Sequence, residues 1–238
     1  MRLDQAVAAR HPDISRTKAR ELIAQRRVLV NDRPVGIASR EVADSDRITI
    51  VEALPELSIL RETKEWVAVD KPAGMPTQPT RDRGLRSLEE LLRVRYGSIF
   101  LVHRIDTWTS GVVVFARTRA AASRLSQLFA SRAIRKTYLA VIDGTIAAET
   151  TIDTPIDGKD ALTIVKPRGG KVVEVEIRTG RMHQIRVHLA SIGHPVAGDR
   201  RYGGSGNLPR MLLHAWQLEH AELGGTLTAP SPADFPPL

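Results

Sequence analysis

The sequence predicts an α+β protein in which a small helix–helix–hairpin domain precedes a larger domain with a mostly antiparallel mixed sheet. Helical and strand periodicities follow one another without a regular βαβ repeat, which disfavours a parallel sheet. The 238 residues are 42% hydrophobic, as expected for a folded chain of one or two domains with a sizeable core. Pro55 and its polar neighbours predict a short linker over residues 53–60.

The first 52 residues are expected to form a domain of their own. Ser15 is a good N-cap for a helix, and Asn and Asp shortly before a proline are typical of a turn. The expected elements are a short helix around Leu3 and Val7, a helix over residues 16–26, a strand over residues 28–30, a turn over residues 31–34 and a strand over residues 47–51.

The second domain is expected to span residues 61–228. Runs of apolar or alternating residues indicate its strands, and apolar residues at helical spacing indicate its helices. The expected strands cover residues 65–70, 112–116, 136–142 and 171–177, and the expected helices cover residues 87–95 and 119–131. Residues 229–238 are rich in proline, so we expect a poorly ordered tail.

The charge of the chain favours a polyanionic partner. Lys and Arg number 35 against 27 Asp and Glu, which gives a formal net charge of +8. Residues 107–142 and 177–198 contain no acid at all, and the second window holds Arg181 and Arg186. Such windows suit binding to phosphates, which counterion release would drive. A merely solvated face is the alternative.

Several classes of protein are disfavoured. The chain has no cysteine, which excludes disulfides, Cys-ligated metals and thiolate nucleophiles. No signal peptide or run of about 18 apolar residues is present, so we expect neither secretion nor membrane insertion but a cytoplasmic monomer. His183 and His188 are separated by five positions rather than the four that stack two ligands on a helix, so we expect no metal.

Two polar clusters stand out as places for chemistry. Residues 101–111 set Asp106 among basic and hydroxyl side chains between two apolar runs. A carboxylate between buried strands needs a cation or hydrogen-bond donors to stay ionised. Taken alone, Asp106 could equally be a structural residue. Residues 179–188 form the second cluster and are expected to open a helix, with Met182 on its apolar face and Arg186 on its flank.

Residues 1–52 resemble the S-four-like RNA-binding module. The resemblance is carried by RLD, SRTKARELI, VLVN and DRITIVE, in that order. It implies that basic residues of the two helices bind RNA phosphates, namely Arg2, Arg16, Lys18 and Arg20. The alternative is a generic helical cap with surface arginines.

The rest of the chain resembles the pseudouridine synthases of the RluA type. The motifs are KPAGMP, HRIDTWTSG, KTYLAVIDG, TGRMHQIRVHLASIGHPVAGDRRYG and LLHAWQL, which occur in that order over roughly residues 60–225. An S-four-like module before such a domain is a familiar arrangement in this family. The resemblance implies an RNA-modifying isomerase.

The resemblance also implies roles for individual residues. Asp106 corresponds to the catalytic aspartate, Arg186 to its arginine partner, and Tyr138 to the tyrosine that packs on the target uracil. Arg104 corresponds to the arginine that fills the gap left by the flipped base, and we expect Arg181 to contact RNA as well. The reaction breaks the uracil–ribose C–N bond, turns the ring and rejoins it through carbon, so no cofactor is expected.

Several alternatives remain open at this point. Asp106 could attack the anomeric carbon, abstract a ribose proton or add to the uracil ring. Large-subunit ribosomal RNA is favoured as substrate, with transfer RNA as the alternative. A noncatalytic RNA-binding or ribosome-assembly factor is the alternative function. Trp108, where a polar residue is commoner in the family, and the short segment 144–171 bear on RNA specificity, and His103 and His214 are expected to be structural or to line the pocket wall.

Overall fold

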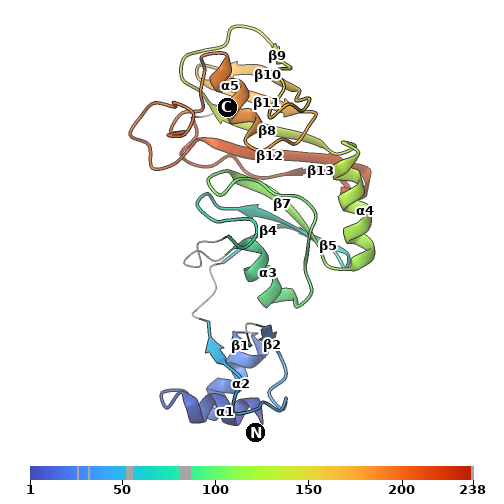
Figure 1. Cartoon of the computed structure of the whole chain (residues 1–238), viewed down its shortest axis with the longest axis vertical. Helices are drawn as coiled ribbons and strands as arrows, with labels where there is room; N and C mark the ends of the chain where they lie inside the picture. Colours follow the sequence, from blue (N-terminus) through green and yellow to red (C-terminus); the bar gives the residue numbers. More distant parts are fainter. Residues whose placement is uncertain (26, 32, 52–55, 81–86, 237–238) are drawn as a thin grey trace. The chain divides into compact units, whose positions relative to one another are not determined.

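The chain divides into two compact units (Figure 1). The computed structural model describes residues 1–25, 27–31, 33–51, 56–80 and 87–236. One unit consists of Met1–Glu56 with Glu89–Ile99, and the larger one of Leu57–Leu88 with Phe100–Leu238. The predicted linker over residues 53–60 lies partly outside the described residues. Its last residues belong to a strand instead, because Ile59 pairs with Val69 of the neighbouring strand.

The N-terminal unit begins with the predicted pair of helices, and its sheet has the order β2-β1-β3 with antiparallel pairing. Its elements are α1 (Leu3–Arg10), α2 (Arg16–Ala24), β1 (Val28–Val30), β2 (Arg33–Val35) and β3 (Ile48–Ile50). The Ser15 hydroxyl accepts a hydrogen bond from the Lys18 amide at 3.2 Å, which confirms the predicted cap. Residues 33 and 34 of the predicted turn belong to β2, because Val30 pairs directly with Arg33, whereas Asn31 lies in the turn and has a φ of +51°.

Within the described residues, the larger unit contains one 10-stranded sheet. Its strands are β4 (Ser58–Glu62), β5 (Trp66–Lys71), β6 (Phe100–Leu101), β7 (Ser110–Ala116), β8 (Arg135–Val141), β9 (Thr150–Ile152), β10 (Thr163–Gly169), β11 (Val172–Ile177), β12 (Leu213–His220) and β13 (Gly225–Thr228). The order is β4-β5-β7-β12-β8-β11-β10-β9, with β6 on β7 and β13 on β12. Every pairing except β7–β12 is antiparallel, which confirms the predicted α+β class.

Two helices cover different parts of this sheet. α4 (Arg119–Ala130) packs Leu125 on the buried face of β7, whereas α5 (Gln184–Ser191) packs Leu189 against β10 and β11. The other helical segments are α3 (Leu88–Tyr96) and the 3-10 turn η1 (Ala221–Leu223). α5 begins two residues after Met182, so Met182 is exposed rather than part of an apolar helix face as predicted.

The C-terminal tail differs from the expectation of poor order. Phe235 is buried against side chains of β8 and β12, and Ala229 is fully buried. Asp234 accepts two hydrogen bonds from the Arg210 guanidinium, both at 2.6 Å. The described part of the proline-rich tail is therefore packed, because one aromatic ring and one ion pair hold it on the sheet.

The parallel contact at the centre of the sheet depends on a glycine. Gly111 of β7 lies opposite Ala215 of β12 and has a φ of +111°. A Cβ atom at Gly111 would lie 2.1 Å from the Ala215 carbonyl oxygen, far inside contact distance. Only glycine allows the two strands to approach this closely with this backbone.

We therefore expect Gly111→Ala to lower the free energy of unfolding by about 3 kcal/mol or more. Gly158→Ala is the matched control, because Gly158 also has a positive φ of +70° but no atom lies within 4 Å of its added Cβ. That variant should lose only about 1 kcal/mol from backbone strain. Urea denaturation measures both values. Equal losses would show that the close approach of the strands is not the cause.

Candidate active site

The candidate site is a hollow of about 390 Å³ in the larger unit. Its wall comes from the loop between β6 and β7, from β8 and from the turn before α5. Five residues singled out from the sequence line it, namely Arg104, Asp106, Tyr138, Arg181 and Arg186. The fold thus brings together side chains from three segments that lie far apart in the chain.

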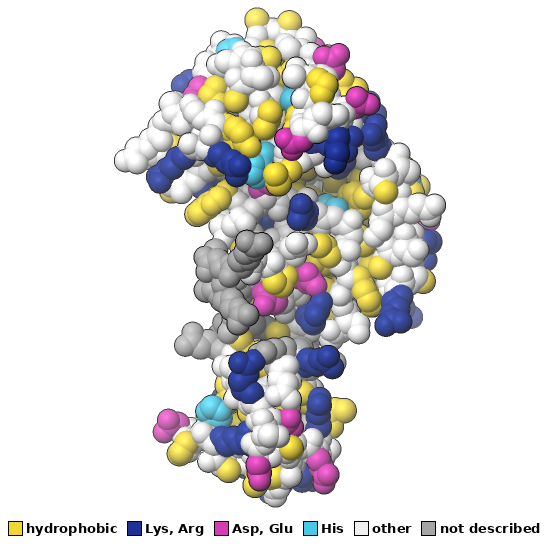
Figure 2. All heavy atoms as spheres, viewed as in Figure 1, with side chains coloured by type: hydrophobic (Ala, Val, Ile, Leu, Met, Phe, Trp, Pro, Cys, Tyr) yellow, Lys and Arg dark blue, Asp and Glu magenta, His cyan; other side chains and the backbone are white. Residues whose placement is uncertain are grey.

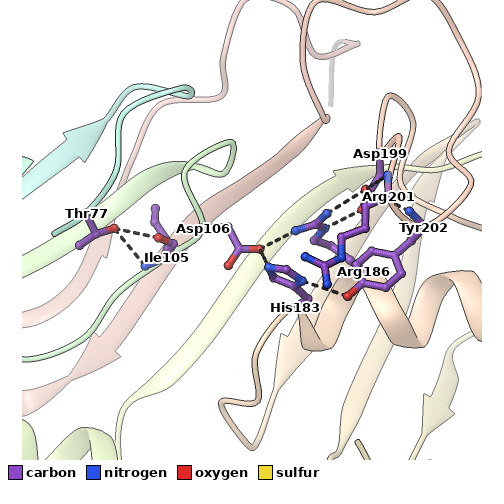
Figure 3. Close-up of polar contacts among 8 residues, drawn as sticks. All are labelled: Thr77, Ile105, Asp106, His183, Arg186, Asp199, Arg201 and Tyr202. Carbon is purple, nitrogen blue, oxygen red and sulfur yellow. Dashed lines mark hydrogen bonds and ion pairs between the residues drawn. The ribbon is translucent and has the colours of Figure 1, made fainter. Parts of the chain in front are cut away.

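The loop that carries Asp106 is fixed by the KPAGMP segment. The buried Lys71 ammonium donates hydrogen bonds to three carbonyl oxygens, of which that of Thr107 lies at 3.1 Å. Burial lowers the pKa of Lys71 to about 7, and the charge of Asp106 opposes this shift. On the other side, the Thr77 hydroxyl donates to the Ile105 carbonyl at 2.8 Å (Figure 3). Both backbone neighbours of Asp106 are therefore held in place.

The Arg186 guanidinium lies between two carboxylates (Figure 3). Its Nε and Nη2 donate to the two oxygens of Asp199 at 2.6 and 2.9 Å, and its Nη1 donates to Asp106 at 3.1 Å. The Asp199 side chain is 2% exposed and that of Asp106 is 30% exposed. Burial opposes the charge of Arg186, but Asp199 and then Asp106 outweigh it and raise its pKa. Asp106 thus has a permanent cation beside it and one side open to the hollow.

His183 lies on the other side of Asp106 and was not assigned a role from the sequence. Its Nε2 is 3.8 Å from an Asp106 oxygen, and its Nδ1 shares a hydrogen bond with the Tyr202 hydroxyl at 2.9 Å (Figure 3). Burial lowers the pKa of His183, while Asp106 opposes that shift. The residue has a φ of +55°, a strained conformation for a side chain of this size. The Tyr202 ring also lies 4.9 Å from the Arg186 guanidinium carbon.

Tyr138 and the two remaining arginines complete the hollow. Tyr138 stands on β8, where it pairs with Val175 and Ala215, and its ring lines the hollow. Burial and the charge of Asp106 raise the pKa of Tyr138 above its ordinary value. Arg104 is exposed at the mouth, and Arg181 is fixed by a hydrogen bond from its Nε to the carbonyl oxygen of residue 160.

Two further histidines near the hollow are held as neutral rings. His103 Nε2 accepts a hydrogen bond from the Val114 amide at 2.9 Å, and burial lowers the pKa of His103 to about 3. His214 Nδ1 lies 2.9 Å from the Ser110 hydroxyl, and burial lowers the pKa of His214 to about 4. These contacts agree with the structural role expected for both.

In the N-terminal unit, three of the four predicted RNA-contacting residues converge on one carboxylate. The guanidinium Nε atoms of Arg2, Arg16 and Arg20 donate to Asp4 at 3.2, 3.0 and 2.9 Å. Burial alone would raise the pKa of Asp4, but these hydrogen bonds outweigh it and hold the pKa well below its usual range. Lys18 stands apart and pairs with an exposed glutamate. Asp4 thereby gathers three half-exposed cations on one surface.

Two kinds of feature are absent from the residues that the structure describes. Among the described residues, no group of three or more His, Asp or Glu side chains is arranged to hold a metal ion. No helix in the described ranges is both long and apolar enough to cross a membrane.

Three residues that contact Asp106, Arg186 or one another in the site were assigned no role from the sequence. Asp199 and Tyr202 belong to the GDRRYG end of the long motif, and His183 to its MHQIR part, so all three were within the segments that carry the resemblance. No local spacing relates Asp199 to Asp106, however, because the strands β7 to β11 and the helices α4 and α5 lie between them in the chain. Their link through Arg186 exists only in the folded chain.

Comparison with known proteins adds independent findings. The family model described as RNA pseudouridylate synthase matches residues 65–191, and that of the S4 domain matches residues 1–48. Ribosomal large subunit pseudouridine synthase D of Nitrosomonas europaea is 33% identical over 98% of this chain and 81% of its own length. An uncharacterized RNA pseudouridine synthase of Bacillus subtilis is 34% identical over 74% of this chain and 67% of its own length.

Among solved structures, human RNA Pseudouridylate Synthase Domain Containing 1 is similar in fold. The TM-score is 0.65 at 27% sequence identity, and the match covers 79% of this chain and 88% of that one.

The buried neutral histidines predict a pH dependence of stability. The unfolded chain protonates them below about pH 6.5, whereas the folded chain keeps them neutral until the pH falls towards about 3 for His103 and about 4 for His214. Their contribution to the free energy of unfolding is thus complete above pH 6.5 and is lost as the pH falls. We expect the free energy of unfolding to decrease between pH 6.5 and 4.5, by up to about 1.4 kcal/mol per pH unit for each histidine.

Denaturation with urea at a series of pH values measures this slope. His103→Gln removes one titrating group and leaves a carbonyl oxygen that can accept from the Val114 amide, so its curve should be flatter. A slope that His103→Gln leaves unchanged would contradict the assignment of the titration to His103.

Proposed function

The chain belongs to the RNA pseudouridylate synthase family, and we propose that it converts specific uridines of large-subunit ribosomal RNA to pseudouridine with Asp106 as the catalytic carboxylate. Family membership makes it an isomerase that acts on RNA. The observation that carries the proposed site is the hydrogen bond between Arg186 and Asp106 in the hollow that Tyr138 also lines.

The carboxylate of Asp106 suits each of the three routes that are chemically open. Attack on the anomeric carbon, removal of a ribose proton and addition to the uracil ring all need an anionic oxygen. Arg186 supplies the positive charge that stabilises such an oxygen when RNA covers the hollow and excludes water. The proposal is therefore the same whichever route the enzyme uses.

The target uridine must leave its stack to enter the hollow. Unstacking costs a few kcal/mol, which contacts made by the flipped base and by its replacement can offset. Arg104 is exposed at the mouth of the hollow, where its planar guanidinium can occupy the vacated position in the RNA. The Tyr138 ring offers an aromatic face for the uracil within the hollow. Arg181 lines the same hollow, where its guanidinium can bind a phosphate of the RNA.

We place the remaining RNA contacts on the N-terminal unit. Arg2, Arg16 and Arg20 each give only one hydrogen bond to Asp4, and their side chains are 45–52% exposed. Lys18 adds a fourth exposed cation. Such a cluster contacts phosphates without reading bases, so it adds affinity that weakens with salt. A relative that matches 98% of this chain is named for the large ribosomal subunit. If transfer RNA proved to be the substrate, the proposal would change to that RNA.

We expect Asp106→Asn to abolish turnover while RNA affinity stays within a few-fold of wild type. Asparagine keeps the size of the side chain but loses the negative charge that every route needs. Release of tritium from RNA labelled at carbon 5 of uridine measures turnover, and filter binding measures affinity. Asp153→Asn, at an exposed aspartate, is the matched control and should retain full activity.

Mapping of pseudouridines in cells identifies the substrate. Cells that lack the gene are supplied with the wild-type or the Asp106→Asn chain, and ribosomal and transfer RNA are compared. A site in large-subunit RNA that depends on intact Asp106 supports the proposal. Appreciable tritium release by Asp106→Asn would remove Asp106 from the chemistry, and a site in transfer RNA alone would replace the proposed substrate.

Tyr138 allows the ring and the hydroxyl to be tested separately. The proton at carbon 5 must leave after the base is rejoined, and the Tyr138 hydroxyl can relay it by accepting that proton while it gives its own proton to a water molecule. Its raised pKa means that the hydroxyl stays protonated and does not act as a tyrosinate base. We expect Tyr138→Phe to keep the stacking, worth about 1–3 kcal/mol per base, but to lose most turnover.

Tyr138→Ala should lose both binding of the flipped base and turnover, because the ring is gone. Single-turnover kinetics and RNA affinity of the two variants provide the comparison. Near-normal single-turnover rates in Tyr138→Phe would leave Tyr138 with a stacking role alone.

A further inference from the structure

Trp108 presents an indole ring at the surface close to the catalytic carboxylate. It lies two residues after Asp106, and 54% of it is exposed to solvent. Exposed tryptophan is uncommon, because burying its large apolar ring is favourable. The other large hydrophobic residues exposed within the described chain are Met1, Ile37 and Met182, none of which has an aromatic face.

Hydrogen bonds fix the backbone that carries the exposed ring. Trp108 occupies a tight turn that the Thr109 amide closes by donating to the Asp106 carbonyl at 3.1 Å. The Thr107 carbonyl accepts hydrogen bonds from the Gly74 amide at 2.8 Å and from the Lys71 ammonium. The indole also lies close to Gly74, since a Cβ there would be 3.5 Å from the ring. A ligand that stacks on this ring would therefore pay little entropy to order it.

Trp108 lies in the wall shared by two hollows. The larger, of about 600 Å³, is lined by Asp106 and Arg104, and the smaller, of about 310 Å³, is lined by Arg200. Trp108 and Arg201 line both. The exposed ring is therefore next to the catalytic site and also faces a second space, which Arg186 lines as well but Asp106 and Tyr138 do not.

The charge around the ring is positive. Within the described ranges, no carboxylate lies within ion-pair distance of Arg104, Arg200 or Arg201, and all three are exposed. Figure 2 shows Lys and Arg side chains interspersed with hydrophobic ones on the larger unit. An aromatic face beside arginines that have no carboxylate partner is typical of surfaces that bind unpaired nucleotides. A docking surface for a neutral protein partner would have no need of these cations.

We propose that Trp108 stacks on the nucleobase next to the target uridine, and that Arg200 and Arg201 bind the phosphate of that neighbouring nucleotide. This inference rests on the RNA substrate proposed above and adds a second subsite to it. Stacking on an aromatic face tolerates any base but requires that the base be unpaired. Trp108 therefore selects uridines whose neighbour can also leave the helix, as in loops and bulges.

Binding measurements on the Asp106→Asn chain test the stacking, since that chain does not consume its substrate. The probe is a synthetic stem–loop that contains the uridine identified by mapping. We expect Trp108→Leu in this chain to weaken binding about tenfold, because leucine has bulk but no flat face. Trp108→Phe keeps an aromatic ring and should stay within about threefold.

Abasic RNAs identify the base that stacks. Two further stem–loops carry an abasic nucleotide immediately before or immediately after the target uridine. On one of these two RNAs, the Asp106→Asn chain with Trp108→Leu should bind as tightly as the Asp106→Asn chain alone, because the base that would stack on Trp108 is already missing. A penalty that persists on both abasic RNAs, or no penalty on the intact RNA, overturns the proposal and leaves Trp108 available to a protein partner.

Tryptophan fluorescence provides a second test that does not need the Trp108→Leu variant to fold. RNA should quench the tryptophan emission of the parent chain and leave that of Trp108→Phe nearly unchanged, and equal quenching overturns the proposal. Failure of the proposed function can be told apart from failure of the stacking proposal, because the chain with intact Asp106 would then release no tritium from any RNA. In that case binding to oligouridylate tests the stacking of Trp108 on its own.

Discussion

The site depends on one guanidinium whose donors are shared between two carboxylates. Asp199 takes two of the hydrogen bonds of Arg186, and the remaining one reaches Asp106. Because Asp199 is almost completely buried, Arg186 cannot leave it without exposing an unpaired charge to a dry interior. The cation beside Asp106 is thus fixed by a more deeply buried carboxylate, and it donates to a single oxygen of Asp106.

The backbone around Asp106 is also held by buried or partly buried side chains. Lys71 and Thr77 hold the peptide groups on either side of Asp106, and the turn they fix also sets the direction of Trp108. A loop would ordinarily be the most mobile place for a functional side chain. Here Lys71, Gly74 and Thr77 donate hydrogen bonds to the backbone of the loop, and these contacts restrict its motion.

Much of the fold could be predicted where the pattern is local. The apolar runs of β5, β7, β8 and β11 and the Ser15 cap were identified within a residue or two. Strands such as β6 and β9, of two and three residues, have no periodicity to detect and exist only because a longer strand lies beside them. The motifs predicted that Arg186 and Asp106 act together, whereas Asp199 could be recognised only once α5 and the following loop were in place.

The parallel contact between β7 and β12 also decides when the site can exist. Ser110 and His214, which face each other across that contact, are separated by 104 positions in the chain. All other strands of the sheet can pair with neighbours that are joined by shorter connections, but the centre closes only after β12 has been synthesised. Asp106 emerges from the ribosome long before that, without the floor of its hollow. Until β12 (Leu213–His220) has been synthesised and has paired with β7 and β8, Asp106 therefore lacks the complete hollow around it.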